Sequence, residues 1–188
     1  MPYVALLPGS RKQEIQSSMP IFEALSREMP EVNFYVAGVT EWKEEYENYT
    51  IPVIFDKTYQ VLFGAQAAIV TSGTATLETA LLKIPQLVVY KTDWLFYSLA
   101  KLLVKIKYIS LVNIILDRAA VPELIQHNFS IPYLTKGLKD IIPNDSQVRI
   151  DQLHAYQELK LRIGTTGASK TTAQKIVEST RKFKLGNS

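Results

Sequence analysis

Apolar runs alternate, over the first half of the chain, with segments whose apolar residues recur every three or four positions. The short runs predict buried strands, and the periodic segments predict amphipathic helices. Strands are predicted over residues 3–7, 32–39, 51–55, 67–71 and 86–90, and helices over 13–28, 41–48, 59–65 and 74–83. This alternation predicts an α/β fold with a Rossmann-like parallel sheet flanked by helices.

Beyond residue 92 the pattern becomes mainly helical. Helices are predicted over 94–106, 147–163 and 168–183, with an apolar connection over 109–116 and a further short segment over 121–126. Gly164 and Gly167 suit a helix stop and a turn. Because no linker or repeat interrupts the chain, residues 1–188 are predicted to form one domain, in which 1–92 is the βα core and 93–188 its mainly helical remainder.

The composition of the chain excludes several kinds of site. The chain has 188 residues, of which 47% are hydrophobic, and this predicts a globular protein with a proper core. The absence of cysteine excludes disulfides, thiolate metal sites and a cysteine nucleophile. Only two histidines, His127 and His154, are present and they lie far apart, so no metal and no cofactor are expected. A net charge of +3 is too small for a nucleic-acid-binding surface but suits an anionic ligand.

The first of two glycine-bearing loops covers residues 6–12, where a predicted strand passes into a predicted helix. Parallel sheets bind ligands at this edge. Gly9 lets the backbone approach an anion closely, Ser10 can cap the helix, and the planar fork of Arg11 suits phosphate oxygens. The loop therefore suits a pyrophosphate, although the same residues also form an ordinary turn with an exposed arginine.

The second loop covers residues 71–78 and also joins a strand to a helix. Ser72, Gly73 and Thr74 offer backbone N–H groups and hydroxyls at a helix N-terminus, and Glu78 can accept both hydroxyls of a ribose. The alternative is that Thr74 caps the helix and Glu78 complements its dipole. Neither loop has the Gly-Lys-Ser/Thr of a kinase-like phosphate loop or the spacing of a dinucleotide-binding loop.

Five runs resemble lipid-A-disaccharide synthase in the same order and at similar spacing: residues 6–15, 71–85, 108–113, 121–126 and 161–169. The resemblance implies the C-terminal, donor-binding half of a GT-B glycosyltransferase. It implies UDP-2,3-diacylglucosamine as the donor, an acylated sugar phosphate, 2,3-diacylglucosamine 1-phosphate, as the acceptor, and UDP as the leaving group. The general base and most acceptor contacts are expected in an N-terminal domain that this chain lacks, so the chain alone is predicted to be inactive.

The resemblance also implies roles for single residues. Arg11 matches the arginine that holds the pyrophosphate, Glu78 the ribose-binding acid, and Asn113 an asparagine near the donor, so that Arg11 and Asn113 are the candidate catalytic residues. Gly9, Ser10, Ser72, Gly73 and Thr74 match the nucleotide-binding loops, and three further candidates for substrate binding are Arg118, Glu123 and Gln126. The sequence departs from the family at Gln13, where glycine is usual, and at Val112, where proline is usual.

Residues 94–106 combine aromatic and aliphatic side chains with lysines, which suits either an interfacial helix or a core-packed helix. The acylated substrates that the resemblance implies favour a cytoplasmic protein at the surface of the inner membrane. The resemblance also implies a homodimer through the C-terminal helices. No signal peptide is evident at the start, which lies within a strand and suggests missing sequence upstream. Alternative functions are another GT-B transferase for UDP-GlcNAc, a sugar-nucleotide epimerase and a non-catalytic nucleotide-binding module.

Overall fold

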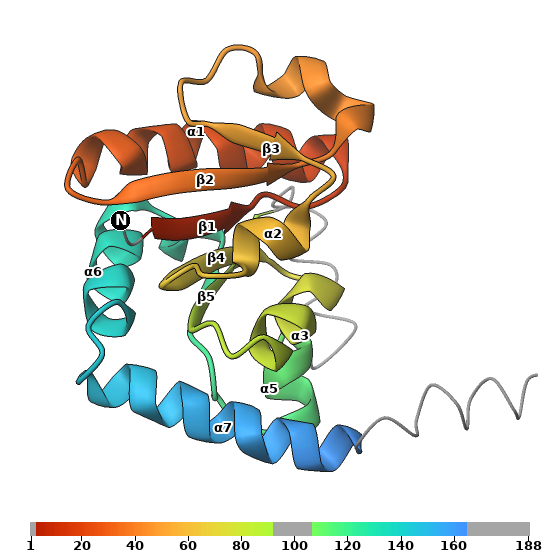
Figure 1. The fold of residues 1–188 in the computed structure, drawn as a ribbon, viewed down its shortest axis with the longest axis vertical. Helices are drawn as coiled ribbons and strands as arrows, with labels where there is room; N and C mark the ends of the chain where they lie inside the picture. Colours follow the sequence, from red (N-terminus) through yellow and green to blue (C-terminus); the bar gives the residue numbers. More distant parts are fainter. Residues whose placement is uncertain (1–2, 92–106, 165–188) are drawn as a thin grey trace, which may run out of the picture.

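A single parallel sheet of six strands forms the centre of the molecule (Figure 1), which a computed structural model describes for residues 3–91 and 107–164. The strands lie in the order β3-β2-β1-β4-β5-β6, and every neighbouring pair is parallel. Their bounds are Tyr3–Leu7 (β1), Asn33–Gly38 (β2), Val53–Phe55 (β3), Ala67–Thr71 (β4), Gln86–Tyr90 (β5) and Glu123–Ile125 (β6). The predicted α/β, Rossmann-like class is confirmed.

Helices cover both faces of this sheet. The helical segments are α1 (Lys12–Glu28), η1 (Thr40–Tyr46), α2 (Thr58–Leu62), α3 (Thr74–Leu81), α5 (Leu111–Leu116), η2 (Gln126–Asn128), α6 (Ile131–Ile141) and α7 (Gln147–Ile163). On one face α1 and α6 pack against the sheet, and on the other α2, α3, α5 and α7 do so. The result is a three-layer sandwich, which is the arrangement that parallel strands require to bury both of their faces.

Alternate residues of β1 supply the two cores. Val4 and Leu6 belong to the core under α1 and α6, whereas Ala5 and Leu7 belong to the core under α2. All four are buried, as are all five residues of β4 beside them. This two-sided burial explains why the sequence shows continuous apolar runs here instead of an alternation of apolar and polar residues.

The second half of the chain differs from its predicted structure. The predicted apolar connection over 109–116 contains a helix, α5, whose N-cap Ser110 accepts a hydrogen bond from the backbone of Asn113 at 3.2 Å. The short segment over 121–126, in the part predicted to be mainly helical, contains the strand β6, which pairs with β5 at the edge of the sheet. Apolar runs this short do not distinguish strand from helix by periodicity.

Helix α6 is absent from the predicted elements, although its signals are present. Ser130 stands at its N-cap position and Pro132 within its first turn, and Leu134, Leu138 and Ile141 follow at helical spacing. The predicted helix over 41–48 is a kinked 3-10 helix, η1. The helices expected over 94–106 and 168–183 lie outside the described residues. Within the segments that the structure describes, no helix is long and apolar enough to cross a membrane.

A buried carboxylate ties α1 to the connection that precedes β3. Glu23 is 6% exposed and accepts hydrogen bonds from the backbone N–H of Thr50 at 3.0 Å, from the Thr50 hydroxyl at 2.6 Å and from Arg27 at 3.0 Å. Burial acts to raise the pKa of Glu23, but the hydrogen bonds from Thr50 and Arg27 outweigh it and lower the pKa below its usual value.

A carboxylate whose pKa is lowered by folding stabilises the protein above its unfolded pKa, and the contribution is lost as the pH falls through the folded value. We therefore expect Glu23→Gln to lower the free energy of unfolding by about 1.5–3 kcal/mol at pH 7, and the deficit to shrink below about pH 4. Urea denaturation at pH 7, 5 and 3.5 measures it. The control is Glu28→Gln, an exposed position of the same helix, and an equal deficit at all three pH values would contradict the prediction.

Candidate functional site

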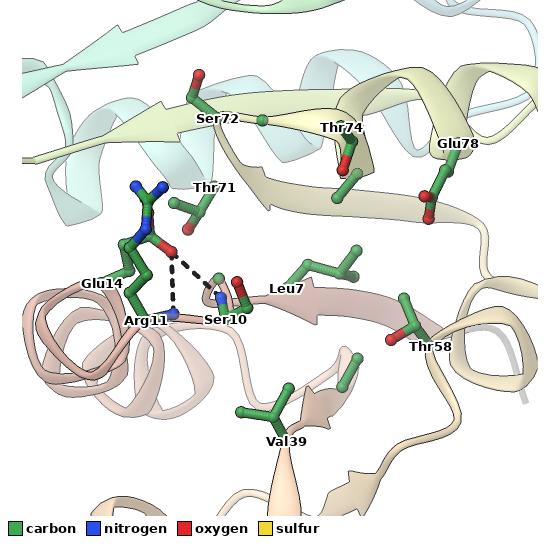
Figure 2. A pocket seen from close by; sticks show the side chains of 14 residues that line it. Leu7, Ser10, Arg11, Glu14, Val39, Thr58, Thr71, Ser72, Thr74 and Glu78 are labelled. Carbon is green, nitrogen blue, oxygen red and sulfur yellow. Dashed lines mark hydrogen bonds and ion pairs between the residues drawn. The ribbon is translucent and has the colours of Figure 1, made fainter. Parts of the chain in front are cut away.

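The candidate site lies where the strand order reverses. The chain runs outward from β1 through β2 to β3 on one side and from β4 through β5 to β6 on the other, so the connections after β1 and β4 diverge to opposite faces of the sheet. Crevices at such switch points are the usual ligand sites of open parallel sheets. A cleft of about 420 Å³ opens there, lined by Leu7, Gly9, Ser10, Arg11, Glu14, Ala37, Val39, Thr58, Thr71, Ser72, Gly73, Thr74, Ala75 and Glu78. The two predicted glycine-bearing loops thus meet in one cleft (Figure 2).

In the first loop, a carboxylate of the protein already occupies the free backbone amides. Oε2 of Glu14 accepts hydrogen bonds from the N–H groups of Ser10 at 3.1 Å and Arg11 at 3.2 Å (Figure 2). The N-cap residue of α1 is Arg11, so the expectation that Ser10 caps this helix is wrong, because the chain enters the helix one residue later. Gly9 has φ +102°, and a Cβ there would lie 2.3 Å from Oε2 of Glu14, so this packing requires glycine.

The side chain of Arg11 extends from this loop toward solvent. It is 83% exposed, and its contact with Glu14 Oε1 at 3.4 Å is long. The guanidinium is therefore free to bind an anion that enters the cleft, in the bidentate manner typical of arginine.

Two side chains of η1 bond to the first loop and to the start of α1. Nε1 of Trp42 donates a hydrogen bond to the carbonyl of Ser10 at 3.2 Å, and Lys12 forms an ion pair with Glu45 at 2.6 Å. The hydrogen bond to Glu45 raises the pKa of Lys12, and the same bond lowers the pKa of Glu45. The acidic segment predicted as a short helix thus fixes the position of the first loop.

The second loop leaves its amides open. Gly73, with φ +142°, is the N-cap of α3, and no side chain caps the helix; the alternative that Thr74 does so is wrong because Thr74 is already the first helical residue. Within the described part of the chain, the N–H groups of Gly73, Thr74 and Ala75 have no hydrogen-bond acceptor. Three free amides at the positive end of a helix form an anion-binding position.

Glu78 lies one turn farther along α3 and half-buried at the other end of the cleft, beside Thr58 (Figure 2). Its carboxylate has no ion pair or hydrogen bond with any residue in 3–91 or 107–164. Ser72 lines the same cleft, but its hydroxyl donates to the carbonyl of Ile109 at 2.8 Å. The structure therefore leaves the Glu78 carboxylate available to a ligand, whereas the Ser72 hydroxyl already has a partner.

Asn113 and Glu123 lie outside this cleft, in a buried polar cluster. The amide of Asn113 donates to the carbonyl of Val121 at 2.9 Å and to Glu123 at 2.8 Å, and it accepts from the N–H groups of Ala120 and Val121. Glu123 also accepts from the N–H groups of Ile109 and Ser110. Both side chains line a second cavity of about 500 Å³. In these contacts Asn113 holds the connection between α5 and β6, and its predicted catalytic role stays a prediction.

The two remaining candidates are also apart from the cleft. Arg118 forms an ion pair with Glu158 of α7 at 2.8 Å. Gln126 begins η2 at the carboxyl end of β6, with φ +54°, a conformation that costs a non-glycine residue about 1–2 kcal/mol. The cleft contains three polar residues that the sequence prediction did not single out, Glu14, Thr58 and Thr71. A Glu three residues after an N-cap is a known sequence signal of a capping box, whereas Thr58 had no signal and Thr71 counted only as the first residue of the predicted second loop.

Charge and polarity divide the cleft into two ends. Arg11 and the open amides of the second loop attract an anion at one end, and Glu78 can accept hydroxyl groups at the other. No group of three or more His, Asp or Glu side chains suited to a metal ion occurs among the described residues. An elongated ligand that combines phosphates with a polyhydroxylated ring matches this arrangement.

Comparison with known proteins gives a family match over most of the chain. A family model described as lipid-A-disaccharide synthetase matches residues 1–177. The chain is 32% identical over 186 residues to the lipid-A-disaccharide synthase of Anaeromyxobacter dehalogenans strain 2CP-C, covering 93% of this chain and 48% of that protein. It is 38% identical over 161 residues to the synthase of Psychromonas ingrahamii, covering 79% and 42%. The chain spans about half the length of the curated relatives it matches.

Solved structures share the fold at low sequence identity. TarM matches with a TM-score of 0.56 at 12% identity, over 93% of this chain and 34% of that chain. The glycotransferase of kitacinnamycin matches with a TM-score of 0.57 at 14% identity, over 92% and 42%. The chain thus shares the fold of one part of each of these proteins, a Rossmann-like parallel sheet flanked by helices.

The contacts of Asn113 lead to a prediction about its role. We expect Asn113→Ala to lower the free energy of unfolding by about 2–4 kcal/mol, because the N–H and the carbonyl of Val121 lose their hydrogen-bond partner, and Ala120 and Glu123 each lose one of theirs. Urea denaturation measures the loss, and Asn144→Ala, at an exposed position between α6 and α7, serves as a control. Unchanged stability together with altered ligand binding would favour the catalytic role instead.

Proposed function

The chain belongs to the lipid-A-disaccharide synthetase family, and on that premise we propose that its cleft binds the UDP-sugar donor of a glycosyl transfer in lipid A biosynthesis. In this proposal the donor is UDP-2,3-diacylglucosamine, the acceptor is 2,3-diacylglucosamine 1-phosphate, and UDP leaves. The observation that carries the proposal is the presence, in one cleft, of three open amides at Gly73, Thr74 and Ala75 and of an unpaired carboxylate one helical turn away at Glu78.

Each end of the cleft receives one part of the nucleotide. The carboxylate of Glu78 accepts the hydroxyls of the ribose, since an ionised carboxylate has acceptors only. The rise of α3 between Thr74 and Glu78 is about 6 Å, which suits the separation of a ribose from its phosphates. The phosphates then lie at the N-terminus of α3, within reach of Arg11, and the loop residues Gly9, Ser10 and Ser72 form the walls.

The same groups assist the transfer. Negative charge accumulates on the diphosphate as the bond to the sugar breaks, and open amides that already point at this charge stabilise the transition state without reorganisation. Arg11 adds a full positive charge at the same end. We propose that Arg11 and the α3 N-terminus stabilise the leaving UDP.

The acceptor hydroxyl needs a general base. Of the two carboxylates that line the cleft, Glu14 accepts two backbone hydrogen bonds and Glu78 is assigned to the ribose. We therefore propose that the base, and most contacts with the acceptor, come from the part of the enzyme that corresponds to the unmatched half of the curated relatives. Asn113, Arg118, Glu123 and Gln126 remain candidates for contact with the rest of the substrates.

We also propose a cytoplasmic enzyme that touches the inner membrane from its surface and forms a homodimer. Both substrates of the proposed reaction carry acyl chains, which concentrate them at a bilayer. The membrane contact is assigned to residues 94–106 on the pattern of their sequence, and the dimer contact to the C-terminal helices on the family resemblance.

Calorimetric titration with UDP tests the nucleotide site. We expect Arg11→Ala to weaken UDP binding about tenfold or more, because a hydrogen-bonded charge pair with phosphate is lost. Lys139→Ala, which removes an exposed positive charge from α6 outside the cleft, is the control. UDP binding that is absent, or equal in wild type and Arg11→Ala, would refute the assignment of the cleft.

A double-mutant cycle tests the ribose contact. Wild type is expected to bind UDP about tenfold more tightly than 2′-deoxy-UDP, because Glu78 loses one hydroxyl donor with the deoxy ligand. In Glu78→Ala the two ligands should bind equally. A preference for UDP that persists in Glu78→Ala would place the ribose elsewhere.

A further inference from the structure

The two loops of the cleft differ in whether their N–H groups can still donate to a ligand. In the first loop the N–H groups of Ser10 and Arg11 are bonded to Glu14, and this carboxylate is only 17% exposed. A phosphate could reach those amides only by displacing a carboxylate that is bonded to both of them. In the second loop the N–H groups of Gly73, Thr74 and Ala75 have no acceptor among residues 3–91 and 107–164.

A second observation points to the same place. Thr71, the last residue of β4, is 5% exposed, and its hydroxyl has no hydrogen-bond partner within the described segments. Thr71 lines the cleft, and Figure 2 shows its side chain in the space between Ser10 and Ser72. A buried hydroxyl without a partner destabilises the protein, and such a group at the base of a cleft is available to a ligand.

We propose that the Thr71 hydroxyl is a ligand of the diphosphate and, with the amides of Gly73 to Ala75, selects a nucleoside diphosphate over a monophosphate. The inference rests on the proposed function. From one end of the cleft to the other, Figure 2 shows Glu78, Thr74, Thr71 and Arg11 in that order. With the ribose at Glu78, the first phosphate meets the amides at Thr74 and the second meets Thr71 and Arg11.

The contact requires a small movement of one side chain. The hydroxyl oxygen of Thr71 is covered in the free chain, so it meets the phosphate after a rotation about the Cα–Cβ bond between staggered positions. A hydroxyl then donates to a charged oxygen, which is the stronger kind of hydrogen bond. Glu14, in contrast, is a positioning residue that closes the first loop and leaves the Arg11 side chain as its contribution to phosphate binding.

The variant Thr71→Val tests the proposal, because valine has the same shape and lacks the hydroxyl. We expect it to weaken UDP binding about tenfold to 100-fold and to leave UMP binding within about twofold. The free protein should become more stable, with a rise of about 2–4 °C in the midpoint of thermal unfolding, because a buried hydroxyl without a partner is removed. Thr71→Ser keeps the hydroxyl and should retain the preference for UDP.

The chain offers a matched control. Thr135 in α6 also has a buried hydroxyl without a partner among the described residues, but it does not line the cleft. Thr135→Val should raise the thermal midpoint in the same direction and leave the ratio of UDP to UMP affinity unchanged.

The outcomes separate the two proposals. If wild type does not bind UDP, the proposed function fails. If wild type binds UDP and Thr71→Val retains the same ratio of UDP to UMP affinity, the assignment of Thr71 is overturned while the nucleotide site stands. A midpoint below that of wild type for Thr71→Val would also overturn the assignment, since it would show that the hydroxyl has a structural partner.

Discussion

Backbone N–H groups that emerge at the carboxyl edge of a parallel sheet need acceptors, and the way this chain supplies them shapes the whole site. At the first loop the protein supplies its own acceptor, the carboxylate of Glu14, and the loop is thereby closed. At the second loop it supplies none within the described residues, and the positive end of α3 faces the cleft. The backbone N–H groups of the first loop are therefore already bonded, whereas those of the second loop are open to a ligand, although both loops carry a glycine and join a strand to a helix.

The sequence alone did not predict this difference between the two loops. Residues 3–7, 67–71 and 86–90 were predicted as strands with the bounds that the structure has, because strands buried on both faces leave continuous apolar runs. The position of both loops at one cleft followed from the sheet. Which amides were free did not follow, because it depends on the side chain three residues after the N-cap. Glu14 folds back and accepts from the free amides of the first loop, whereas the Thr76 hydroxyl donates to the carbonyl of Gly73 and leaves the amides of the second loop open.

The second half of the chain was harder to predict for a different reason. Strand β6 has three residues and is defined by its pairing with β5, a contact between residues more than thirty positions apart. The helix α5 begins at a cap that depends on Ser110 and on the distant Glu123. Of the elements described in residues 107–164, α7, the longest, was alone predicted with its true bounds, 147–163. Local pattern is therefore sufficient where an element is long or wholly buried, and insufficient where tertiary partners decide.

The hydrogen bonds of Ser72 and Thr76 connect the second loop to a stretch more than thirty residues farther along the chain. The Ser72 hydroxyl donates to the carbonyl of Ile109, and the Thr76 hydroxyl accepts from the N–H of Leu111. The carboxylate of Glu123 accepts from the N–H groups of Ile109 and Ser110 in the same stretch. The spacing of the open amides is thus set by a segment that follows them by more than thirty residues. A displacement of residues 109–111 would therefore move the N-terminus of α3 and its open amides, although this short stretch does not itself line the cleft.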